Sequence, residues 1–454
     1  MTDPKKTELR LDSFDQSERL DALNLLKKSA VRPPQTGFVN LHCHTFFSFN
    51  AYGYSPSHIA WKALQEGLEV VGVVDFDVLD GADEMRAAGE ILGVKTVAGL
   101  ETRVAIPEYA DRVINSPGEK GVSYFIGIGI GGSPEPETKA SGVLATLRAT
   151  AEKRNLSRLS KINALLGDIR LSYEKDVLPL TPLGNATERH IFQALIKKAE
   201  ERFGKDRERL ADFWSTRLKE DKGRISSAMR SLPGFLELLR ARLIKEISHE
   251  DTGCSLKSFP ALEEVIGMIR SMGGLPTAAW LDGTNEGEKD IRNLLEFLRS
   301  KGVGVLNVIP DRNWNIQNAE EKKIKVKNLD IVIRTARDLD FPLIAGTEMN
   351  KYGQKFVDDF LAPELNPYLE DFQNGAAFVY GHAEMARIFG KGYESLWANR
   401  ALPDESRRRR FFTEAGELIR PGWGSRSAAV GEEIKPEDLI ALLKTKRGKN
   451  EKFQ

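Results

Sequence analysis

The sequence has few cysteines, no long apolar run and no excess of either charge. Its 454 residues include only two cysteines, Cys43 and Cys254, which excludes a disulfide framework and a cysteine-rich zinc module. Lysine plus arginine number 66, as do aspartate plus glutamate, so the formal charge is zero. That balance argues against a general nucleic-acid coat or a binder of anionic membranes. The longest apolar stretches, such as Val70–Val74 and Tyr124–Ile130, are too short to span a bilayer.

The N-terminal residues are polar and lack the apolar core of a secretory signal. We therefore expect a cytoplasmic protein that acts on a small molecule and has neither nucleic acid nor membrane as a partner. Apolar residues make up 41% and charged residues 29%, an ordinary composition for a globular protein.

Short apolar runs alternate with amphipathic, helix-like segments through much of the chain. Such alternation predicts parallel strands joined by helical crossovers, each strand covered on both faces. The expected strands are Phe38–His44, Glu69–Asp75, Lys95–Glu101, Ser123–Ile130, Leu275–Leu281, Val303–Val308 and Pro342–Thr347. Seven strands with helices between them predict an α/β fold, a seven-stranded (β/α) barrel.

The alternation is interrupted after the fourth strand, and the chain divides accordingly. We expect an N-terminal lead-in over residues 1–36, a first barrel part over 37–134 and a second over 259–355. Between them, residues 135–258 are rich in Lys, Arg, Glu and Leu and predict a helical insertion. Residues 356–454 predict a C-terminal helical extension, in which Ala376–Tyr380 resembles one further strand and Arg407–Arg410 a solvated helix face.

Polar side chains stand at the ends of the expected strands, where the active site of a β/α barrel lies. His42 and His44 are two residues apart on the first strand, so both can point into the barrel mouth and bind a transition metal. The other strand-end groups are Asp75, Asp77, Glu101, Arg103, Tyr124, Trp280, Asn307, Arg312, Glu348, Asn350 and Lys351. Taken singly, the aspartates could cap the next helix and Glu101 could pair with Arg103. Their convergence favours a metal or a polar ligand, because burying so many polar groups is otherwise costly.

Several of these stretches resemble the PHP (polymerase and histidinol phosphatase) superfamily. The specific matches are Asn40–Thr45 with Ser48, Ser55-Pro56, Asp75-Phe76-Asp77 with Leu79-Asp80-Gly81, and Gly99-Leu100-Glu101. Looser matches follow in Gly184–Leu195, Ala261–Trp280, Gly302–Asn307 and Gly346–Asn350. The resemblance covers about residues 37–355 and implies a metal-dependent phosphoesterase on a distorted barrel.

The resemblance also implies a metal site that has lost several ligands. His42, His44 and Glu101 match the family's ligand types, and Glu348 stands where an aspartate is usual. Residues that do not match are Asn50 for an aspartate, and Phe76, Tyr124, Ala279 or Trp280, and Asn350 for histidines. We therefore expect one divalent ion (Zn, Mn or Fe) held by His42, His44, Glu101 and Glu348.

These assignments predict a metal-dependent hydrolase that cleaves a small phosphorylated metabolite with an activated water molecule. Asp75 or Asp77 would act as the general base. The expected substrate-binding residues are Arg103, Asn307, Arg312, Asn350, Lys351 and His382, the last as a possible replacement for a lost ligand. Basic residues of the insertion, including Arg154 and Arg158, could attract an anionic substrate.

Two alternatives remain open at this point. A degenerate barrel could bind a sugar- or nucleoside-like ligand, because aromatic and amide groups replace the lost histidines. A one-metal site could also catalyse a different reaction, such as C–O lysis or deacylation.

Overall fold

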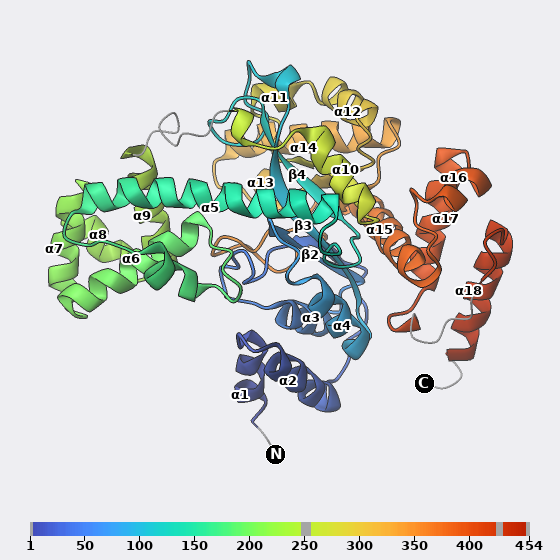
Figure 1. Cartoon of the computed structure of the whole chain (residues 1–454), viewed down its shortest axis with the longest axis horizontal. Helices are drawn as coiled ribbons and strands as arrows, with labels where there is room; N and C mark the ends of the chain where they lie inside the picture. Colours follow the sequence, from blue (N-terminus) through green and yellow to red (C-terminus); the bar gives the residue numbers. More distant parts are fainter. Residues whose placement is uncertain (1–2, 247–255, 424–429, 451–454) are drawn as a thin grey trace.

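A computed structural model describes residues 3–246, 256–423 and 430–450. Of these residues, 56% are helical, and they surround a seven-stranded mixed sheet that nearly closes into a barrel (Figure 1), which confirms the predicted α/β fold. The strands are β1 (Val39–Cys43), β2 (Val70–Phe76), β3 (Lys95–Ala105), β4 (Val122–Ile128), β5 (Leu275–Trp280), β6 (Val305–Val308) and β7 (Leu343–Ala345). They lie in chain order in the sheet.

The helices fall into four groups along the chain. The lead-in and first barrel part hold α1 (Pro4–Leu9), α2 (Gln16–Ser29), α3 (Pro56–Gln65) and α4 (Ala82–Leu92). The insertion holds α5 (Lys139–Leu166), α6 (Glu188–Phe203), α7 (Arg207–Leu218), α8 (Lys222–Ala228) and α9 (Leu232–Glu246). The second barrel part holds α10 (Leu262–Ser271), α11 (Glu286–Lys289), α12 (Ile291–Ser300), α13 (Asp311–Trp314) and α14 (Ala319–Asp338). The extension holds α15 (Leu369–Phe389), α16 (Leu396–Ala401), α17 (Glu405–Leu418) and α18 (Pro436–Asn450).

Strand β4 runs against its neighbours, so the expectation of an all-parallel sheet is wrong. β4 pairs antiparallel with both β3 and β5, and the remaining pairs are parallel. Residues 106–121 join β3 to β4 with a short 3-10 turn and no α-helix, whereas parallel strands are usually joined through a crossover helix. The start of β4 therefore lies at the same rim as the ends of the parallel strands, which is why Tyr124 reaches this rim.

The barrel closes where the residues after β7 meet the end of β1. The backbone N–H of His44 donates to the carbonyl of Glu348 at 2.8 Å, and the N–H of Glu348 donates to the carbonyl of His42 at 2.7 Å. A Cβ on Gly346 would lie 2.2 Å from the His42 Cβ, so this close approach requires glycine. The closure fixes both histidines against the far end of the sheet.

Ala376–Tyr380 is helical, so the expected additional strand is wrong. The segment lies within α15, which packs against β7 and buries residues around most of its circumference. A short continuous apolar run is equally compatible with a buried strand and a buried helix, and here tertiary packing decides.

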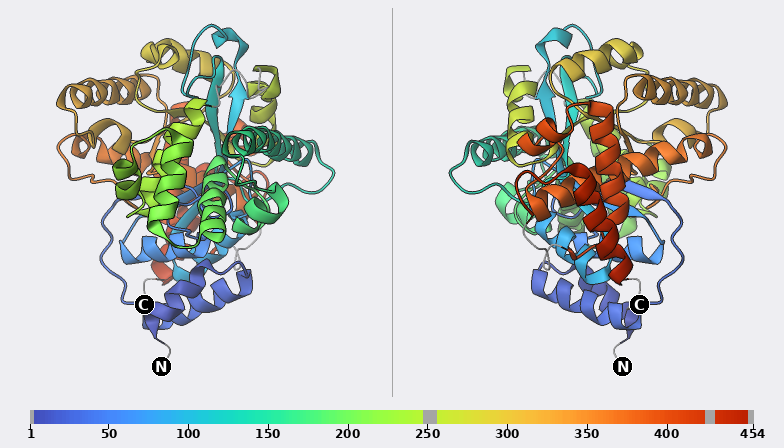
Figure 2. Two further views of the ribbon diagram at one scale, coloured as in Figure 1. Left: turned by 90° about the vertical axis from the view of Figure 1, so that its left-hand side faces the viewer. Right: turned by 90° about the vertical axis from the view of Figure 1, so that its right-hand side faces the viewer.

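The insertion and the extension cover opposite sides of the barrel. Figure 2 shows α6–α9 in front in one side view and α15–α18 in front in the other. The insertion has a hydrophobic cluster of its own, separate from the barrel core, with Phe192, Trp214 and Leu239 among its most buried residues. Among the described residues, none of the helices combines the length and apolar character needed to cross a membrane.

The lead-in is folded onto the barrel rather than free. Leu11, Leu23 and Leu26 are buried in the barrel's own core cluster, and α2 packs on α4. A buried ion pair joins Arg19 of α2 to Glu84 of α4 (Nε to Oε1, 2.9 Å).

Candidate metal centre

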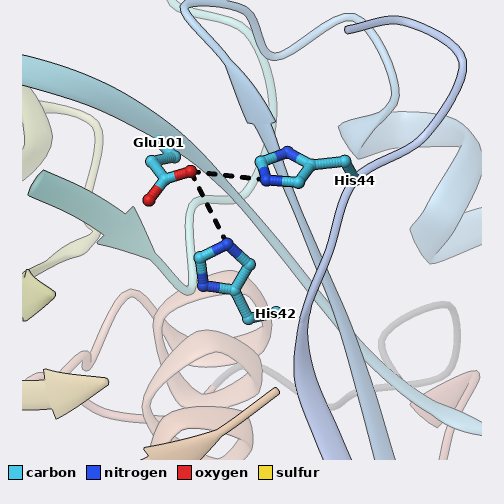
Figure 3. Close-up of side chains that lie close together, drawn as sticks. All are labelled: His42, His44 and Glu101. Carbon is cyan, nitrogen blue, oxygen red and sulfur yellow. Dashed lines mark ion pairs between the residues drawn. The ribbon is translucent and has the colours of Figure 1, made fainter. Parts of the chain in front are cut away.

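Three buried side chains converge inside the barrel at the end of β1. His42 and His44 point to the same side, and their Nε2 atoms lie 3.6 and 3.3 Å from Oε2 of Glu101 on β3 (Figure 3). One potential ligand atom from each of the three residues lies within 4.8 Å of the other two. The alternation expected for β1 therefore holds: the histidines share a face, and the buried Cys43 lies between them in sequence.

The donor atoms of this cluster suit a metal ion. His42 is 1% and His44 0% exposed, and none of their four ring nitrogens has a hydrogen-bond partner. Buried polar groups without partners are costly, and such groups call for a bound ion or molecule. Two imidazole nitrogens and one carboxylate oxygen form a donor set that Zn²⁺, Mn²⁺ and Fe²⁺ accept.

The electrostatics of the cluster also favour a cation. Burial lowers the pKa of His42, but the Glu101 carboxylate outweighs this effect and holds that pKa above its usual value. Burial raises the pKa of Glu101, but His42 and His44 outweigh this effect and bring it to about 2. The carboxylate thus stays ionised and attracts positive charge, which a proton or a metal ion can supply.

Glu348 does not join the three-residue cluster. Its two carboxylate oxygens each lie 2.9 Å from Nη2 of Arg312, and Oε2 accepts a further hydrogen bond from Gln354 at 3.0 Å. Both Glu348 and Met349 have left-handed backbone conformations, with φ of +61° and +59°. Strain of this kind at non-glycine residues is concentrated at functional sites. The structure thus places the residue beside the cluster, with its carboxylate directed to Arg312.

Asp75 and Asp77 have different environments. Asp75 accepts hydrogen bonds from the N–H and hydroxyl of Thr45 and from the hydroxyl of Ser48, at 2.6–2.7 Å, so it holds the loop after β1. Asp77 faces a large cavity, accepts from Thr102 at 2.5 Å, and lies 3.7 Å from Arg154. Burial raises the pKa of Asp77. Gly81, rather than either aspartate, precedes α4, so the helix-cap alternative is wrong.

A cavity of about 780 Å³ lies over the cluster, between the barrel rim and the insertion. Phe76 contacts both: its ring stacks on His44 with centroids 4.1 Å apart, and it also lines the cavity. Most arginines of the wall are paired: Arg103–Glu119, Arg158–Glu188, Arg189–Glu237, Arg240–Glu188 and Arg312–Glu348. The cavity therefore combines aromatic surface with many guanidinium groups.

The remaining predicted site residues divide into three sets. Arg103, Asn350 and Lys351 line the cavity with Arg312. Asn307 is buried beside His42, and its Oδ1 has no hydrogen-bond partner. His382 lies elsewhere, on α15, where its Nε2 is 2.7 Å from the carbonyl of Gly273 and its Nδ1 accepts from the N–H of Tyr393.

Trp280 is not a site residue, contrary to the interpretation that grouped it with the ligand-binding aromatics. Ala279 pairs with Asn307 across the sheet and shares its inward face, whereas Trp280 pairs with Val308 on the opposite face. The position of Trp280 at the end of a predicted strand did not determine on which face of the sheet its side chain lies.

Sequence reasoning missed one residue of the insertion that holds the site together. The side-chain amide of Asn185 donates to the carbonyl of Phe47 at 3.1 Å and to that of Phe76 at 2.8 Å. It therefore ties the insertion to the loop after β1 and to the last residue of β2. In the sequence, the indication that Asn185 lies near the site was its position in Gly184–Leu195, the stretch that resembles the family's insertion.

Asp358 supports the helix that carries Arg312. Its Oδ1 accepts from the indole N–H of Trp314 at 2.9 Å, and burial raises its pKa to about 7. A carboxyl group whose pKa is raised on folding stabilises the folded protein fully at pH values below its pKa in the unfolded chain. For Asp358 this contribution is lost as the pH rises through about 7.

We therefore expect the free energy of unfolding of Asp358→Asn, relative to that of the wild type, to increase as the pH rises. Asparagine keeps the acceptor for Trp314 and removes the ionisation. Urea unfolding of both proteins at about pH 5 and about pH 8 measures the change. An equal difference in unfolding free energy at the two pH values would contradict this interpretation.

Comparison with known proteins places these observations in context. No known family profile matches the chain. An error-prone DNA polymerase of Cutibacterium acnes is 32% identical over 90 residues, which are 19% of this chain and 8% of that polymerase. The match therefore spans a small part of the polymerase.

Two solved structures align with much of this chain at low sequence identity and with TM-scores below 0.5. An amidohydrolase from Chromobacterium violaceum, with bound sulfate and no metal, is 16% identical, with a TM-score of 0.45 over 74% of this chain and 96% of that one. A protein described as a metal-dependent phosphoesterase from Bifidobacterium adolescentis is 18% identical, with a TM-score of 0.44 over the same shares.

Proposed function

We propose that this protein is a metal-dependent hydrolase of small phosphate esters, with one divalent metal ion held by His42, His44 and Glu101. The observation that carries the proposal is the pair of buried imidazoles whose Nε2 atoms face one carboxylate, with no hydrogen-bond partner for any of their ring nitrogens. The arginine-rich cavity over this cluster supports an anionic substrate.

The chain's own groups would bind and orient the ester. A divalent metal at this cluster supplies polarisation of a phosphoryl oxygen and a lowered pKa for a water molecule. Arg103, Arg312 and Lys351 face the cavity and would hold the phosphoryl group, since each arginine has donors beyond those its carboxylate uses. Asp77 is the better candidate of the two predicted bases, because it lines the cavity and Asp75 does not.

A second candidate function is ligand binding without catalysis. Phe76 covers His44 on the side of the cavity, and Phe49, Tyr124 and Tyr352 also line that cavity. Aromatic surface of this kind suits a sugar- or nucleoside-like ligand. On this alternative, a metal at the cluster would be structural and shielded from the ligand.

A panel of phosphate monoesters and diesters, assayed with added Mn²⁺, Zn²⁺ or Fe²⁺, distinguishes the two. The proposal predicts metal-dependent release of phosphate, or of a phosphomonoester from a diester, that is lost on dialysis against a chelator and restored by metal. Absence of turnover on every ester, together with a ligand-induced rise in melting temperature, would favour the binding protein.

A substitution at Arg154 tests whether the insertion takes part in substrate binding. Arg154 lies on α5, lines the cavity, is 8% exposed, and its Nη1 has no hydrogen-bond partner. We expect Arg154→Gln to raise KM about tenfold or more with a smaller change in kcat, because a charge-assisted hydrogen bond to the substrate is lost.

Steady-state kinetics on the best substrate of the panel measures this effect. Lys153→Gln, a change at the adjacent exposed residue of α5, is the matched control. Equal KM values for the two variants would remove the insertion from the binding site.

A further inference from the structure

A second cavity, of about 650 Å³, lies at the other end of β7. Its walls are the start of β7 with the residues before it, α15 and α17. Phe341, Pro342 and Leu343 line this cavity, whereas residues after β7, such as Glu348, line the first cavity. The two cavities therefore lie at opposite ends of one strand, and the second is far from the candidate metal centre in the fold.

One face of α17 supplies the polar wall of this second cavity. The residues are Ser406, Arg409, Arg410, Thr413, Glu414 and Glu417. Their spacing of three or four residues places them on one side of the helix. The extension thus contributes a continuous polar face that the barrel alone would not have.

The four consecutive arginines of α17 have four different environments. Arg407 pairs with Glu437 of α18, and Arg408 is buried over the ring of Tyr393. Arg409 and Arg410 line the cavity. The expectation of a solvated helix face is therefore wrong for Arg408 and Arg409, whereas Arg407 and Arg410 are exposed.

The α17 wall carries two arginines and two glutamates, and its arginines keep donors without a carboxylate partner. Arg409 contacts Asp340 and Glu405, but its Nε is buried without a hydrogen-bond partner. Burial, and then repulsion from Arg299 and Arg410, lowers the pKa of Arg409 to about 10. Arg410 donates to the hydroxyl of Ser406 and has no carboxylate partner among the described residues.

Most of the carboxylates near the cavity have cationic partners already. Asp371 pairs with Arg337, Asp340 with Arg409, and Glu414 with Lys444. Within the described part of the chain, Glu417 is the lining carboxylate without an ion pair. Arg410 is the corresponding lining cation without an ion pair among the described residues, and Arg409 adds a buried Nε without a hydrogen-bond partner.

We propose that this cavity binds a compact anion of the phosphoryl class through Arg409 and Arg410, independently of the metal centre. Guanidinium groups bind such oxyanions through pairs of parallel hydrogen bonds, and an anion between them relieves their mutual repulsion. The adjoining apolar wall of Phe341, Pro342 and Phe378 would accept an organic group attached to the phosphoryl group.

Titration calorimetry on the full chain, in a buffer containing a chelator, tests the proposal with two probes. Inorganic phosphate represents the free ion, and phenylphosphonate, which cannot be hydrolysed, represents a phosphorylated metabolite. The variant is Arg410→Gln, an exposed position whose loss leaves the packing intact. Arg407→Gln removes the same charge from the same helix outside the cavity and is the matched control.

We expect Arg410→Gln to weaken binding of at least one probe about tenfold or more, and Arg407→Gln to leave it unchanged. Arg312→Gln/Lys351→Gln, in the first cavity, should retain this binding event. Tighter Arg410-dependent binding of phenylphosphonate than of phosphate would identify a phosphorylated metabolite as the ligand, and equal binding would identify the free ion. The proposal is overturned if the wild type binds neither probe, if Arg410→Gln behaves as Arg407→Gln does, or if the first-cavity variant abolishes all binding.

Discussion

Replacing Glu101 by glutamine is expected to lower kcat/KM for phosphate-ester hydrolysis by at least about 100-fold, since changes to residues that merely support metal ligands already cost 10- to 100-fold. Glutamine has nearly the same shape, so the barrel should fold. The substitution removes the negative charge that faces both imidazoles at 3.3 and 3.6 Å. The metal affinity should fall with the activity, because two neutral imidazoles alone hold a divalent cation weakly.

The measurement is steady-state kinetics over a range of added Mn²⁺ or Zn²⁺. Glu66→Gln, at an exposed position after α3, is the matched control and should leave the kinetics unchanged. Activity of Glu101→Gln equal to that of the control, at every metal concentration, would show that the cluster does not hold the catalytic metal.

Replacing Arg19 by methionine is expected to destabilise the protein by about 3–5 kcal/mol, because it leaves a buried carboxylate without its cation. Arg19 is 2% and Glu84 1% exposed, and the pair is reinforced by a hydrogen bond from Arg19 to the carbonyl of Ser13 at 2.7 Å. The guanidinium also lies over the ring of Phe46, 5.1 Å from its centroid. Phe46 belongs to the loop that follows His44, so the lead-in stabilises the neighbourhood of the metal centre.

Urea unfolding of the wild type, Arg19→Met and the double variant Arg19→Met/Glu84→Leu tests this interpretation. The double variant should be more stable than Arg19→Met, because neither member leaves an unpaired buried charge. If Arg19→Met loses less than about 1 kcal/mol, in the range of an exposed ion pair, the buried pair does not anchor the lead-in.

The barrel could be predicted from the sequence because its strands are buried on both faces. Each of the seven expected apolar runs overlaps an observed strand, and the alternation on β1 correctly placed His42 and His44 on one face. Local periodicity is strong where the core imposes it, and those residues carry the signal.

The parts that could not be predicted depend on contacts between distant segments. The direction of β4 accompanies a link without a crossover helix, and the helical state of Ala376–Tyr380 follows from packing against the barrel. The partner of Glu348 could not be inferred either: its carboxylate meets Arg312, which lies 36 residues earlier in the chain. A residue type predicts possible ligands, but only the fold determines which other charges reach them.

Metal analysis of the purified protein, beside a His42→Ala/His44→Ala variant purified in the same way, tests the central claim most directly. We predict about one equivalent of a divalent transition metal in the wild type and almost none in the variant, since two of the three proposed ligands are gone. Equal metal content in the two proteins, or none in the wild type even after incubation with Zn²⁺, Mn²⁺ or Fe²⁺, would contradict the assignment of the metal centre to these residues.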